Sequence, residues 1–498
     1  MNQKSIAIIG AGIAGLSAGC YARMNGYDAT IYEMHNLPGG VCTSWKRQGY
    51  TIDGCIGWLL GSSPSSSYYR IYEELGAVQG RTFINHDEFL RVHDENGQEL
   101  VLYTDPDKLE AHLKQLSPAD APVIDEFMAA LRVCARFNPD VEKAPELMSP
   151  LDGLKFLSQN GAFLKVNAAW KDVTMADFAA RFSSPFLRRA FPLAFSDPFA
   201  LIMTLGWLSQ KAAGFPLGGS LEFARAIERR FLALGGQIHY GARVEQILVE
   251  GGRACGLRLV DGSRQPADIV ISAADGHATL FDLLQGEYLN DDLRRYYKDF
   301  SLYDPLVYVT LGVARSFAGL PHWVVYPLPE APDLPVIGGQ AQPSLGVEIY
   351  NFDPSLAPIG KTLIKCMFPC DYDYWKNLSA DPARYQAEKD NIADWVIAQL
   401  DQHYPGLAAQ VDMRDVATPL TWERYTANWR GSFEGWKMTK ENTPPFRMPR
   451  TLPGLRNFYM AGQWVEVGGG IPAVAVSARN LLQIICKADG RKFTAFLP

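Results

Sequence analysis

The chain has 498 residues, of which 47% are hydrophobic and 20% are charged, and its formal net charge is -7. This length predicts about two to four domains, and the composition is typical of globular proteins with large cores. The acidic balance gives no general basis for electrostatic attraction to nucleic acid, so we expect no nucleic-acid partner. The oligomeric state stays open.

The cysteines and the first residues indicate the compartment. Eight cysteines in a chain of this length do not form a disulfide framework, and no pair of C-x-x-C motifs is present, so we expect no metal site. The first apolar stretch is short and lacks the basic segment that precedes a secretory signal. No run of about 20 apolar residues is present either. We therefore expect a cytoplasmic protein.

Residues 5–33 carry the most informative pattern in the chain. An apolar run at 6–9 predicts a buried strand, a helix is expected to extend to about Asn25, and a second strand at 29–32 ends on Glu33. An acidic residue at the tip of this second strand accepts hydrogen bonds from the ribose of a bound dinucleotide.

The turn between the first strand and the helix contains Gly10, Gly12 and Gly15 at G-x-G-x-x-G spacing. Gly10 permits the tight turn, Gly12 lets a pyrophosphate approach the backbone, and Gly15 lets the helix pack closely on the sheet. The helix N-terminus presents free N–H groups to the phosphates. This pattern predicts dinucleotide binding. The alternative is a βαβ unit whose glycines serve packing alone.

The loop after Glu33 contains the pair Gly39-Gly40, then Val41, and an extended segment follows at 49–54. Residues 36–61 are rich in glycine and small polar residues but contain few charges. Loops of this kind often lie against ligands, so we expect this one to face the dinucleotide.

Residues 76–213 are predicted to be mostly helical, for example at 122–137 and 174–182. Their apolar segment 190–208 is interrupted by Ser196, Asp197 and Pro198. Two interpretations stay open for it. It forms two buried helices joined by a turn, or it lines a cavity for an apolar ligand and touches a membrane surface.

A nucleotide-binding pattern returns after residue 213. Gly218-Gly219-Ser220 is expected to open a helix that extends to Leu234, with Ser220 as its N-cap. Strands are predicted at 237–240, 242–249, 256–259 and 268–272. The turn Asp261-Gly262 is expected to separate the last two of them.

The remainder of the chain contains a second β-rich region. An antiparallel sheet is predicted from runs at 306–313, 323–326, 347–350 and 362–368, and a long helix is expected at 382–403. A strand at 457–461 leads into Gly462. The turn Gly468–Pro472 then begins a last helix at 473–486.

The order of these elements predicts an α/β fold with interleaved domains. A Rossmann-like dinucleotide-binding domain is expected to be assembled from three segments, 1–75, 214–285 and 450–498. The insertions 76–213 and 286–449 are expected to form an α+β substrate-binding domain on the antiparallel sheet.

This order of pieces resembles the flavoprotein family of phytoene desaturases, carotenoid isomerases and retinol saturases. Amine oxidases and protoporphyrinogen oxidase are more distant relatives. The glycine fingerprint, Glu33 and Gly39-Gly40 together resemble an FAD-type motif, because NAD-only enzymes usually lack the second glycine pair. Segments similar to the carotenoid branch cover the chain in order, at 49–53, 218–220, 267–275, 353–361, 418–421, 431–435, 461–462, 468–472 and 477–479.

The resemblance implies FAD as the cofactor of the dinucleotide-binding domain. Amine oxidases often attach their flavin to a cysteine near the C-terminal motif, and residues 463–472 contain none, so we expect non-covalent FAD. Val41 departs from the family pattern, since many relatives have an arginine there, and Val244 is expected to meet the adenine through its backbone. The predicted cofactor residues are Gly10, Gly12, Ile13, Ala14, Gly15, Glu33, Gly39, Gly40, Val41, Val244, Gly462, Gly470, Ile471 and Pro472.

The resemblance also implies the chemistry. In that family an allylic hydride passes from an apolar polyene to flavin N5, and a proton leaves the neighbouring carbon. Conjugation spreads the developing charge, so no strong acid–base pair is required, and the sequence shows no convincing triad, carboxylate dyad or metal set. Catalytic side chains therefore stay unassigned. An apolar substrate of this kind implies peripheral membrane contact.

Several side chains are candidates for lining the substrate site, with ordinary core packing as the alternative for each. The aromatic candidates for an apolar tunnel are Trp58, Tyr68, Tyr69, Trp207, Trp422, Tyr425 and Trp464. Glu423 and Arg424 are either polar groups near the flavin or a surface ion pair. His277 and His322 are weak candidates for a catalytic base.

Three functions remain as hypotheses. The leading one is an FAD-dependent oxidoreductase that desaturates, saturates or isomerises a hydrophobic isoprenoid or polyene. The second is a flavin amine or small-molecule oxidase of the same superfamily. The third is a non-enzymatic, escort-type lipid-binding protein with a similar fold.

Overall fold

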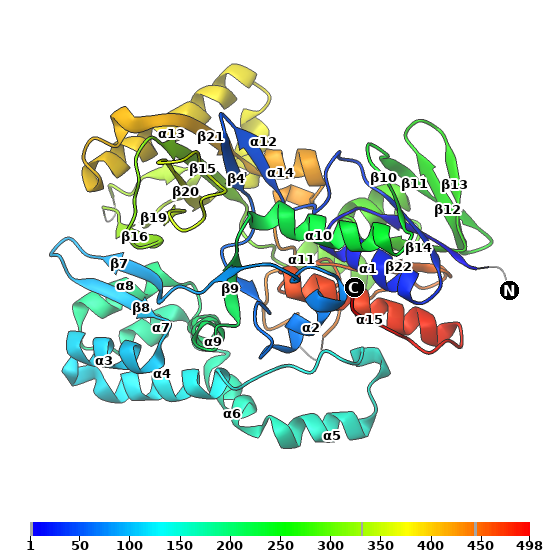
Figure 1. Ribbon diagram of the computed structural model, residues 1–498, viewed down its shortest axis with the longest axis horizontal. Coiled ribbons are helices and arrows are strands. Elements are labelled where there is room, and N and C mark those ends of the chain that lie inside the picture. Colours follow the sequence, from blue (N-terminus) through cyan, green and yellow to red (C-terminus); the bar gives the residue numbers. More distant parts are fainter. Residues whose placement is uncertain (1–2, 330–331, 443–445) are drawn as a thin grey trace.

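The computed structural model describes residues 3–329, 332–442 and 446–498 (Figure 1). Two large sheets organise these residues, one with five strands and one with seven. In the view of Figure 1 the five-stranded sheet lies on the right and the seven-stranded sheet on the upper left. A group of helices fills the lower left.

The five-stranded sheet is parallel, with the strand order β10-β2-β1-β14-β22. Its strands are β1 (Ser5–Ile9), β2 (Asp28–Tyr32), β10 (Gln237–His239), β14 (Ile269–Ser272) and β22 (Phe458–Met460). They are short apolar runs because both faces of the sheet are covered. These strands agree with the sequence predictions to within about two residues at each end.

Each face of this sheet has its own cover. One face packs against three helices, α1 (Ile13–Met24), α10 (Gly219–Ala233) and α15 (Ile471–Ala488). The other packs against a small antiparallel sheet made of β11 (Val244–Glu250), β12 (Arg253–Leu259) and β13 (Arg264–Pro266). Successive residues of β1 therefore enter two different cores.

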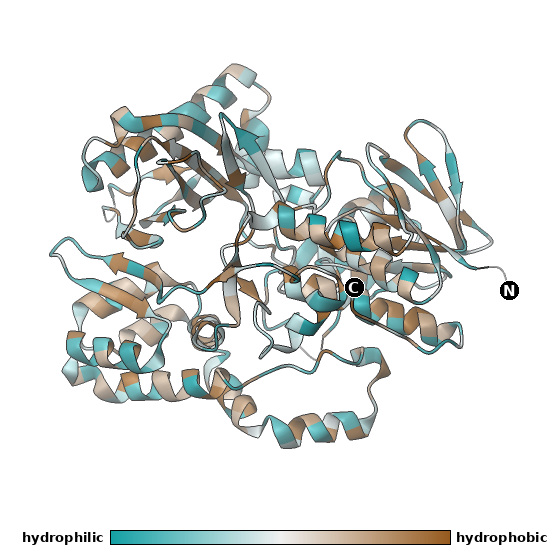
Figure 2. Cartoon of the chain, in the orientation of Figure 1, coloured by the Kyte–Doolittle hydropathy of each residue, from teal (hydrophilic) through white to brown (hydrophobic). Residues whose placement is uncertain are grey.

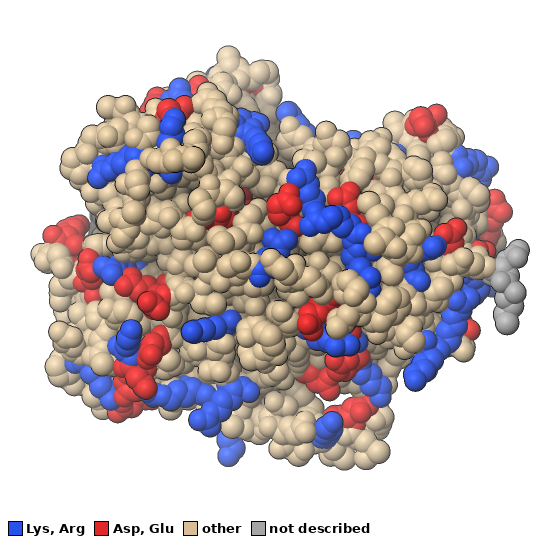
Figure 3. Space-filling view, viewed as in Figure 1, with Lys and Arg blue, Asp and Glu red and all other residues tan. Residues whose placement is uncertain are grey.

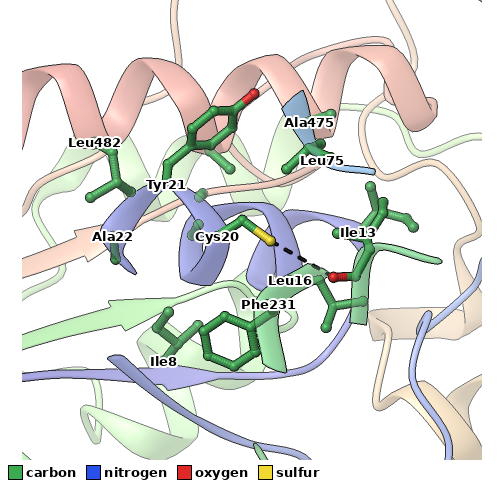
Figure 4. Packing of buried hydrophobic residues seen from close by; sticks show 14 of the residues in the cluster. Ile8, Ile13, Leu16, Cys20, Tyr21, Ala22, Leu75, Phe231, Ala475 and Leu482 are labelled. Carbon is green, nitrogen blue, oxygen red and sulfur yellow. Dashed lines mark hydrogen bonds between the residues drawn. The ribbon is translucent and has the colours of Figure 1, made fainter. Parts of the chain in front are cut away.

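Figure 4 shows the core around α1, with Ile8 on one side of the helix and Leu482 on the other. Ile8 of β1 belongs to the same buried cluster as Leu16 and Cys20 of α1 and Leu482 of α15. The Cys20 thiol donates a hydrogen bond to the carbonyl oxygen of Ile227 in α10, at 3.7 Å. This packing holds the N-terminus of α1 at the carboxyl end of β1.

The seven-stranded sheet has the order β21-β15-β20-β19-β16-β7-β8 and is antiparallel except for the pair β16-β7. Its strands are β7 (Glu88–His93), β8 (Glu99–Tyr103), β15 (Leu306–Val313), β16 (Trp323–Pro327), β19 (Ser344–Ile349), β20 (Thr362–Pro369) and β21 (Val411–Ala417). Helix α13 (Pro382–His403) packs against it, at the bounds predicted from the sequence. The predicted antiparallel sheet is confirmed.

The segment 76–213 is helical after residue 105 but not before it. Its helices are α3 (Pro106–Leu116), α4 (Ala121–Cys134), α5 (Pro150–Gln159), α6 (Gly161–Trp170), α7 (Met175–Ala180), α8 (Pro185–Ala194) and α9 (Pro198–Ser209). The prediction missed the hairpin of β7 and β8, which extends the seven-stranded sheet. Its apolar residues pack between that sheet and the helices, so tertiary contacts decide its structure.

Shorter elements connect these layers. The strands are β3 (Ser44–Arg47), β4 (Tyr50–Asp53), β5 (Leu59–Leu60), β6 (Phe83–Ile84), β9 (Ala213–Pro216), β17 (Val336–Ile337) and β18 (Gln340–Ala341). The helices are α2 (Ser67–Glu74), α11 (Asp291–Asp299), α12 (Tyr372–Leu378) and α14 (Pro419–Thr426), with a π-helical turn at Ala278–Leu283. β3 and β4 form a hairpin.

Two local predictions were wrong. Ser220 is not the N-cap, because the N-cap of α10 is Gly218, two residues earlier, and Ser220 lies inside the helix. The Ser220 hydroxyl instead donates to Asp53 Oδ1 at 2.6 Å and accepts from the N–H of Ile56, which joins α10 to the loop after β4. The turn Asp261-Gly262 connects β12 to β13, and β14 leaves to join the parallel sheet.

Candidate functional site

One large cavity of about 1840 Å³ extends from the parallel sheet to the seven-stranded sheet. At one end it is bordered by the turn after β1 and by the tip of β2. At the other end it is bordered by residues of β15, β16, β19 and β20. A space of this size, shared by the two sheets, accommodates a dinucleotide and a second molecule beside it.

The N-terminal half of the site is built on the glycine-rich turn. Gly10, Gly12, Ile13 and Ala14 border the cavity. Gly10 has a φ of +93°, which a residue with a side chain rarely adopts. A Cβ added to Gly12 would have a single neighbour within 4 Å, the Gly39 carbonyl oxygen at 3.9 Å. The Gly12 backbone is therefore open to a ligand.

Gly15 differs from the other predicted cofactor residues because it does not border the cavity. A Cβ at this position would lie 1.9 Å from the carbonyl oxygen of Gly10. The absence of a side chain lets α1 start directly against the turn. Gly15 thus has the packing role that the spacing predicted, without a place in the cavity wall.

Glu33 joins the end of β2 to the glycine-rich turn. Its Oε2 accepts a hydrogen bond from the N–H of Ala11 at 2.6 Å, and its Oε1 accepts from His35 at 2.8 Å. The residue is 7% exposed and borders the cavity. Burial raises the pKa of Glu33, and these backbone donors act in the opposite direction. The carboxyl group is therefore fixed at the rim of the site.

The loop after β2 closes over the turn. Gly39 forms a parallel bridge with Gly12, and its N–H donates to the Ala11 carbonyl oxygen at 2.8 Å. Gly39, Gly40 and Val41 all border the cavity, as does Val244 at the start of β11. The structure brings these residues together although they come from three distant parts of the chain.

The C-terminal glycines form the facing wall. Gly462, Gly470, Ile471 and Pro472 border the cavity, and Gly470 is the N-cap of α15. Neither Gly470 nor Gly12, the N-cap of α1, has a side chain that could cap its helix. Two helix N-termini with free N–H groups thus face one cavity, and this arrangement favours a phosphate ligand.

The remaining wall is largely apolar and aromatic. Five of the seven aromatic candidates border the cavity, namely Trp58, Tyr68, Trp207, Tyr425 and Trp464. Tyr69 and Trp422 do not, and Trp422 packs in the core against Tyr308, with ring centroids 5.2 Å apart. The two halves of the cavity thus differ in chemistry.

Both interpretations of the segment 190–208 hold in part. It forms α8 and α9, which are joined by a turn, and residues 195–197, 199–200, 203–204 and 207 border the cavity. The two helices meet at 75° and pass a test for a membrane span only as a bent pair. Within the described residues, no single helix is long and apolar enough to cross a membrane.

The ionisable side chains of the cavity wall that the sequence did not indicate include Asp275, Glu434, Lys365 and Glu348. Asp275 is buried and accepts from the N–H groups of Ala278 and Trp429, at 2.7 and 2.8 Å. Glu434 makes no side-chain hydrogen bond or ion pair with the residues that the structure describes, and burial raises its pKa to about 7. Lys365 and Glu348 form an ion pair at 3.0 Å.

The other candidates lie outside this cavity. His277 is stacked between Phe281 and Trp429, and His322 is stacked on His86 with the ring centroids 3.6 Å apart. Burial lowers the pKa of His322 to about 3, so it is neutral at physiological pH. Glu423 forms an ion pair with Lys376 at 3.4 Å, as the surface alternative expected, but its partner is not Arg424. No cluster of potential metal ligands is found among the described residues.

The chain is similar to known proteins over almost its whole length. Residues 13–481 match the family described as flavin containing amine oxidoreductase. Phytoene desaturase (lycopene-forming) of Pseudescherichia vulneris is 26% identical over 499 residues, covering 96% of this chain and 98% of its own. Prolycopene isomerase, chloroplastic, of Arabidopsis thaliana is 24% identical over 493 residues, covering 94% and 80%. The crystal structure of an oxidoreductase from Methanosarcina mazei superposes with a TM-score of 0.58 at 18% identity, covering 96% and 100%.

Proposed function

The chain belongs to the flavin-containing amine oxidoreductase family, and on that premise we propose that it is an FAD-dependent oxidoreductase of a hydrophobic isoprenoid or polyene. The observation that carries the proposal is the single cavity, which joins two uncapped helix N-termini to an aromatic wall. The resemblance to desaturases and an isomerase over nearly the whole chain supports the substrate class. Desaturation, saturation and cis–trans isomerisation all fit this arrangement.

The predicted cofactor residues fit FAD by their placement. The helix N-terminus at Gly12 suits the pyrophosphate, and the Glu33 carboxylate suits the adenosine ribose. The N-terminus of α15 at Gly470 offers further N–H groups to the cofactor. Val244 borders the same cavity, which supports its expected contact with the adenine. When bound, FAD supplies hydride exchange at N5. The absence of a cysteine from residues 463–472 supports non-covalent binding.

The division into domains follows the two sheets. We assign 1–75, 214–285 and 450–498 to an FAD-binding domain, because every strand of the parallel sheet falls in these segments. The segments 76–213 and 286–449 are assigned to a substrate-binding domain, since they supply every strand of the seven-stranded sheet. The cavity borders both assigned domains, so each contributes one half of the site.

Glu434 is the side chain best placed to exchange a proton with the substrate. It borders the cavity, and its Oε1 lies 4.0 Å from the position of a Cβ added to Gly470. Asp275 has a similarly raised pKa, about 7, but both of its oxygens are occupied by backbone donors. A carboxyl group that titrates near neutral pH can accept or donate a proton under physiological conditions.

Membrane contact is proposed for a surface other than 190–208. Five of the large exposed apolar side chains lie in residues 148–157, at and before α5, and are Met148, Leu151, Leu154, Phe156 and Leu157 (Figure 2). Three lysines are exposed on α5, on the next helix α6 and directly after α6, namely Lys155, Lys165 and Lys171. Figure 3 shows basic side chains along the lower edge of the molecule, where Figure 1 labels α5 and α6. This composition favours the surface of an anionic bilayer.

The same helices also reach the cavity, which supports substrate entry from the bilayer. Phe156 of α5 and Phe163 and Leu164 of α6 border it. We propose a cytoplasmic protein that works at the membrane surface. All eight cysteines are free thiols, which fits a reducing compartment.

Purification of the protein tests the cofactor and the substrate class together. We expect a yellow protein that releases FAD on denaturation and carries apolar lipids, which mass spectrometry would identify. A colourless protein that stays empty when FAD is added would contradict the proposal. Co-purification of small polar amines, with no lipid, would favour the oxidase of amines instead.

A further inference from the structure

A charged pair lies in the part of the cavity that the seven-stranded sheet borders. Lys365 on β20 and Glu348 on β19 are directly opposite in the sheet register, and Nζ lies 3.0 Å from Oε2. Their side chains are 3% and 11% exposed, and both residues border the cavity. Charges buried to this extent cost free energy unless they are paired and hydrogen-bonded.

The Lys365 ammonium has more donors than the described residues occupy. It carries three N–H groups, and its one ionic partner among those residues is Glu348. The rings of Tyr308 and Tyr350 lie with their centroids 5.5 and 5.3 Å from Nζ and attract the charge through their faces. Such contacts leave N–H groups available to an oxygen atom in the cavity.

Tyr308 supplies a second free polar group at the same place. The residue is 4% exposed and borders the cavity, yet its hydroxyl makes no hydrogen bond to the residues that the structure describes. The hydroxyl of Tyr350, by contrast, donates to Glu348 Oε2 at 2.6 Å. The Tyr308 hydroxyl and the Lys365 ammonium thus both face the cavity with hydrogen-bonding capacity that the described residues leave free, and together they can bind one oxygen atom there.

The charges around the subsite restrict that partner. The charges of Lys365 and Glu348 neutralise each other. Asp53 is a second carboxyl group that interacts electrostatically with Lys365. Its own oxygens are occupied by Ser220, Cys55 and Ile56. A further carboxylate would add a like charge to a buried cluster, whereas a neutral oxygen would not.

We propose that Lys365, Tyr308 and Glu348 form a subsite for a neutral oxygen atom, a carbonyl or a hydroxyl, at one end of an otherwise apolar substrate. This inference rests on the proposed function and refines its substrate class, from polyenes in general to oxygenated polyenes. Two further residues of the same sheet, Trp323 and Met367, border the cavity and would contact the hydrocarbon part of the substrate.

The test compares three polyenes of equal length that end in an aldehyde, an alcohol or a methyl group. Their dissociation constants for the flavin-loaded protein are measured by quenching of tryptophan fluorescence. We expect the aldehyde and alcohol to bind about tenfold more tightly than the hydrocarbon. Tyr308→Phe should weaken binding of the oxygenated compounds several-fold and leave the hydrocarbon unchanged. Tyr372→Phe, whose hydroxyl contacts Glu423 outside the cavity, is the matched control.

A second variant tests the ion pair without leaving a buried charge that could unfold the protein. Lys365→Met alone leaves Glu348 unpaired, so Lys365→Met/Glu348→Gln removes both charges together. It should abolish the preference for oxygenated polyenes. Equal affinity of the wild type for all three compounds would overturn the subsite and leave the polyene function standing. Failure of all three to bind would overturn both.

Discussion

At the scale of single residues, the glycines of one fingerprint have separable roles. Gly12 has a φ of -66°, and a side chain there would extend into open cavity. Gly15 has no such space, because its Cβ would meet the carbonyl oxygen of Gly10. The same motif therefore contains one position that serves the ligand and one that serves the fold.

Gly12→Val and Gly15→Ala should consequently fail in different ways. We expect Gly12→Val to fold normally, with the melting temperature of the wild-type apoprotein, and to lose flavin because the side chain occupies the pyrophosphate position. Gly15→Ala should lower the free energy of unfolding by roughly 1–3 kcal/mol through overpacking. Flavin content and thermal melting of the apoproteins measure both effects. A Gly12→Val protein with normal flavin content would contradict the placement.

Glu434 predicts a pH dependence whose sign reports the direction of the reaction. Its pKa is raised to about 7 by burial, so the carboxylate form increases as the pH rises through 7. If the enzyme desaturates its substrate, kcat/KM should rise over this range, because the carboxylate accepts the proton. If it saturates, kcat/KM should fall, because the acid form donates it.

Glu434→Gln should flatten this profile near pH 7 and lower kcat by about 100-fold or more. Glu423→Gln is the control, since that carboxylate is paired with Lys376 at the surface, and it should keep the wild-type profile. A wild-type profile without an ionisation near pH 7, measured in either direction, would remove Glu434 from the chemistry.

The sequence predicted the glycine-rich turns that border the cavity but not the strand residues of the proposed oxygen subsite. Glycines 10, 39 and 470 need positive φ angles, and such requirements are visible in the local sequence. Lys365, Tyr308 and Glu348 occupy strand positions whose meaning depends on the register with other strands. Their neighbours are distant in the chain, so no local pattern indicates that they meet.

At the scale of elements, α5 and α6 are the least enclosed of the α-helices that the structure describes. α5 has no buried residue, and α6 has one, Trp170. Leu151 and Leu154 are 74% and 62% exposed. Isolated short helices are only marginally stable in water, so a further surface such as a bilayer would stabilise them.

Replacing Leu151 and Leu154 with serine should weaken binding to vesicles of anionic phospholipid about tenfold or more, because each leucine contributes apolar surface. Co-sedimentation measures it, and activity on detergent-dispersed substrate should be retained. Leu232→Ser is the control, since Leu232 is 47% exposed on α10. Equal loss of binding in both variants would argue against a specific role for α5.

Element prediction succeeded where the pattern was long or local. Helix α13 begins with Asp381 as N-cap and Pro382 in its first turn, and both signals are visible in the sequence. The hairpin β7–β8 was hidden because its neighbours, β16 and α8, come from later parts of the chain. The apolar residues of the hairpin are buried only when β16 and α8 are in place, so the local sequence does not predict the strands.

At the scale of the whole molecule, function arises from the meeting of two sheets. Every predicted cofactor residue except Gly15 borders the same cavity as the aromatic wall and the Lys365 subsite. The chain order predicted interleaved pieces because the glycine motifs recur at both ends. The shape of the cavity was not predictable, because it depends on where the seven-stranded sheet and the helices α5, α6 and α9 meet.

The most direct measurement follows flavin and polyene absorbance together, without oxygen, after the holoprotein is mixed with a polyene. It is made once with oxidised and once with reduced flavin, and repeated with a panel of amines. We expect the polyene spectrum to change with at least one flavin state. Desaturation would bleach the oxidised flavin, and saturation would reoxidise the reduced flavin. Isomerisation would change the polyene alone. Bleaching by amines, with the polyenes unaltered in both states, would contradict the proposed function.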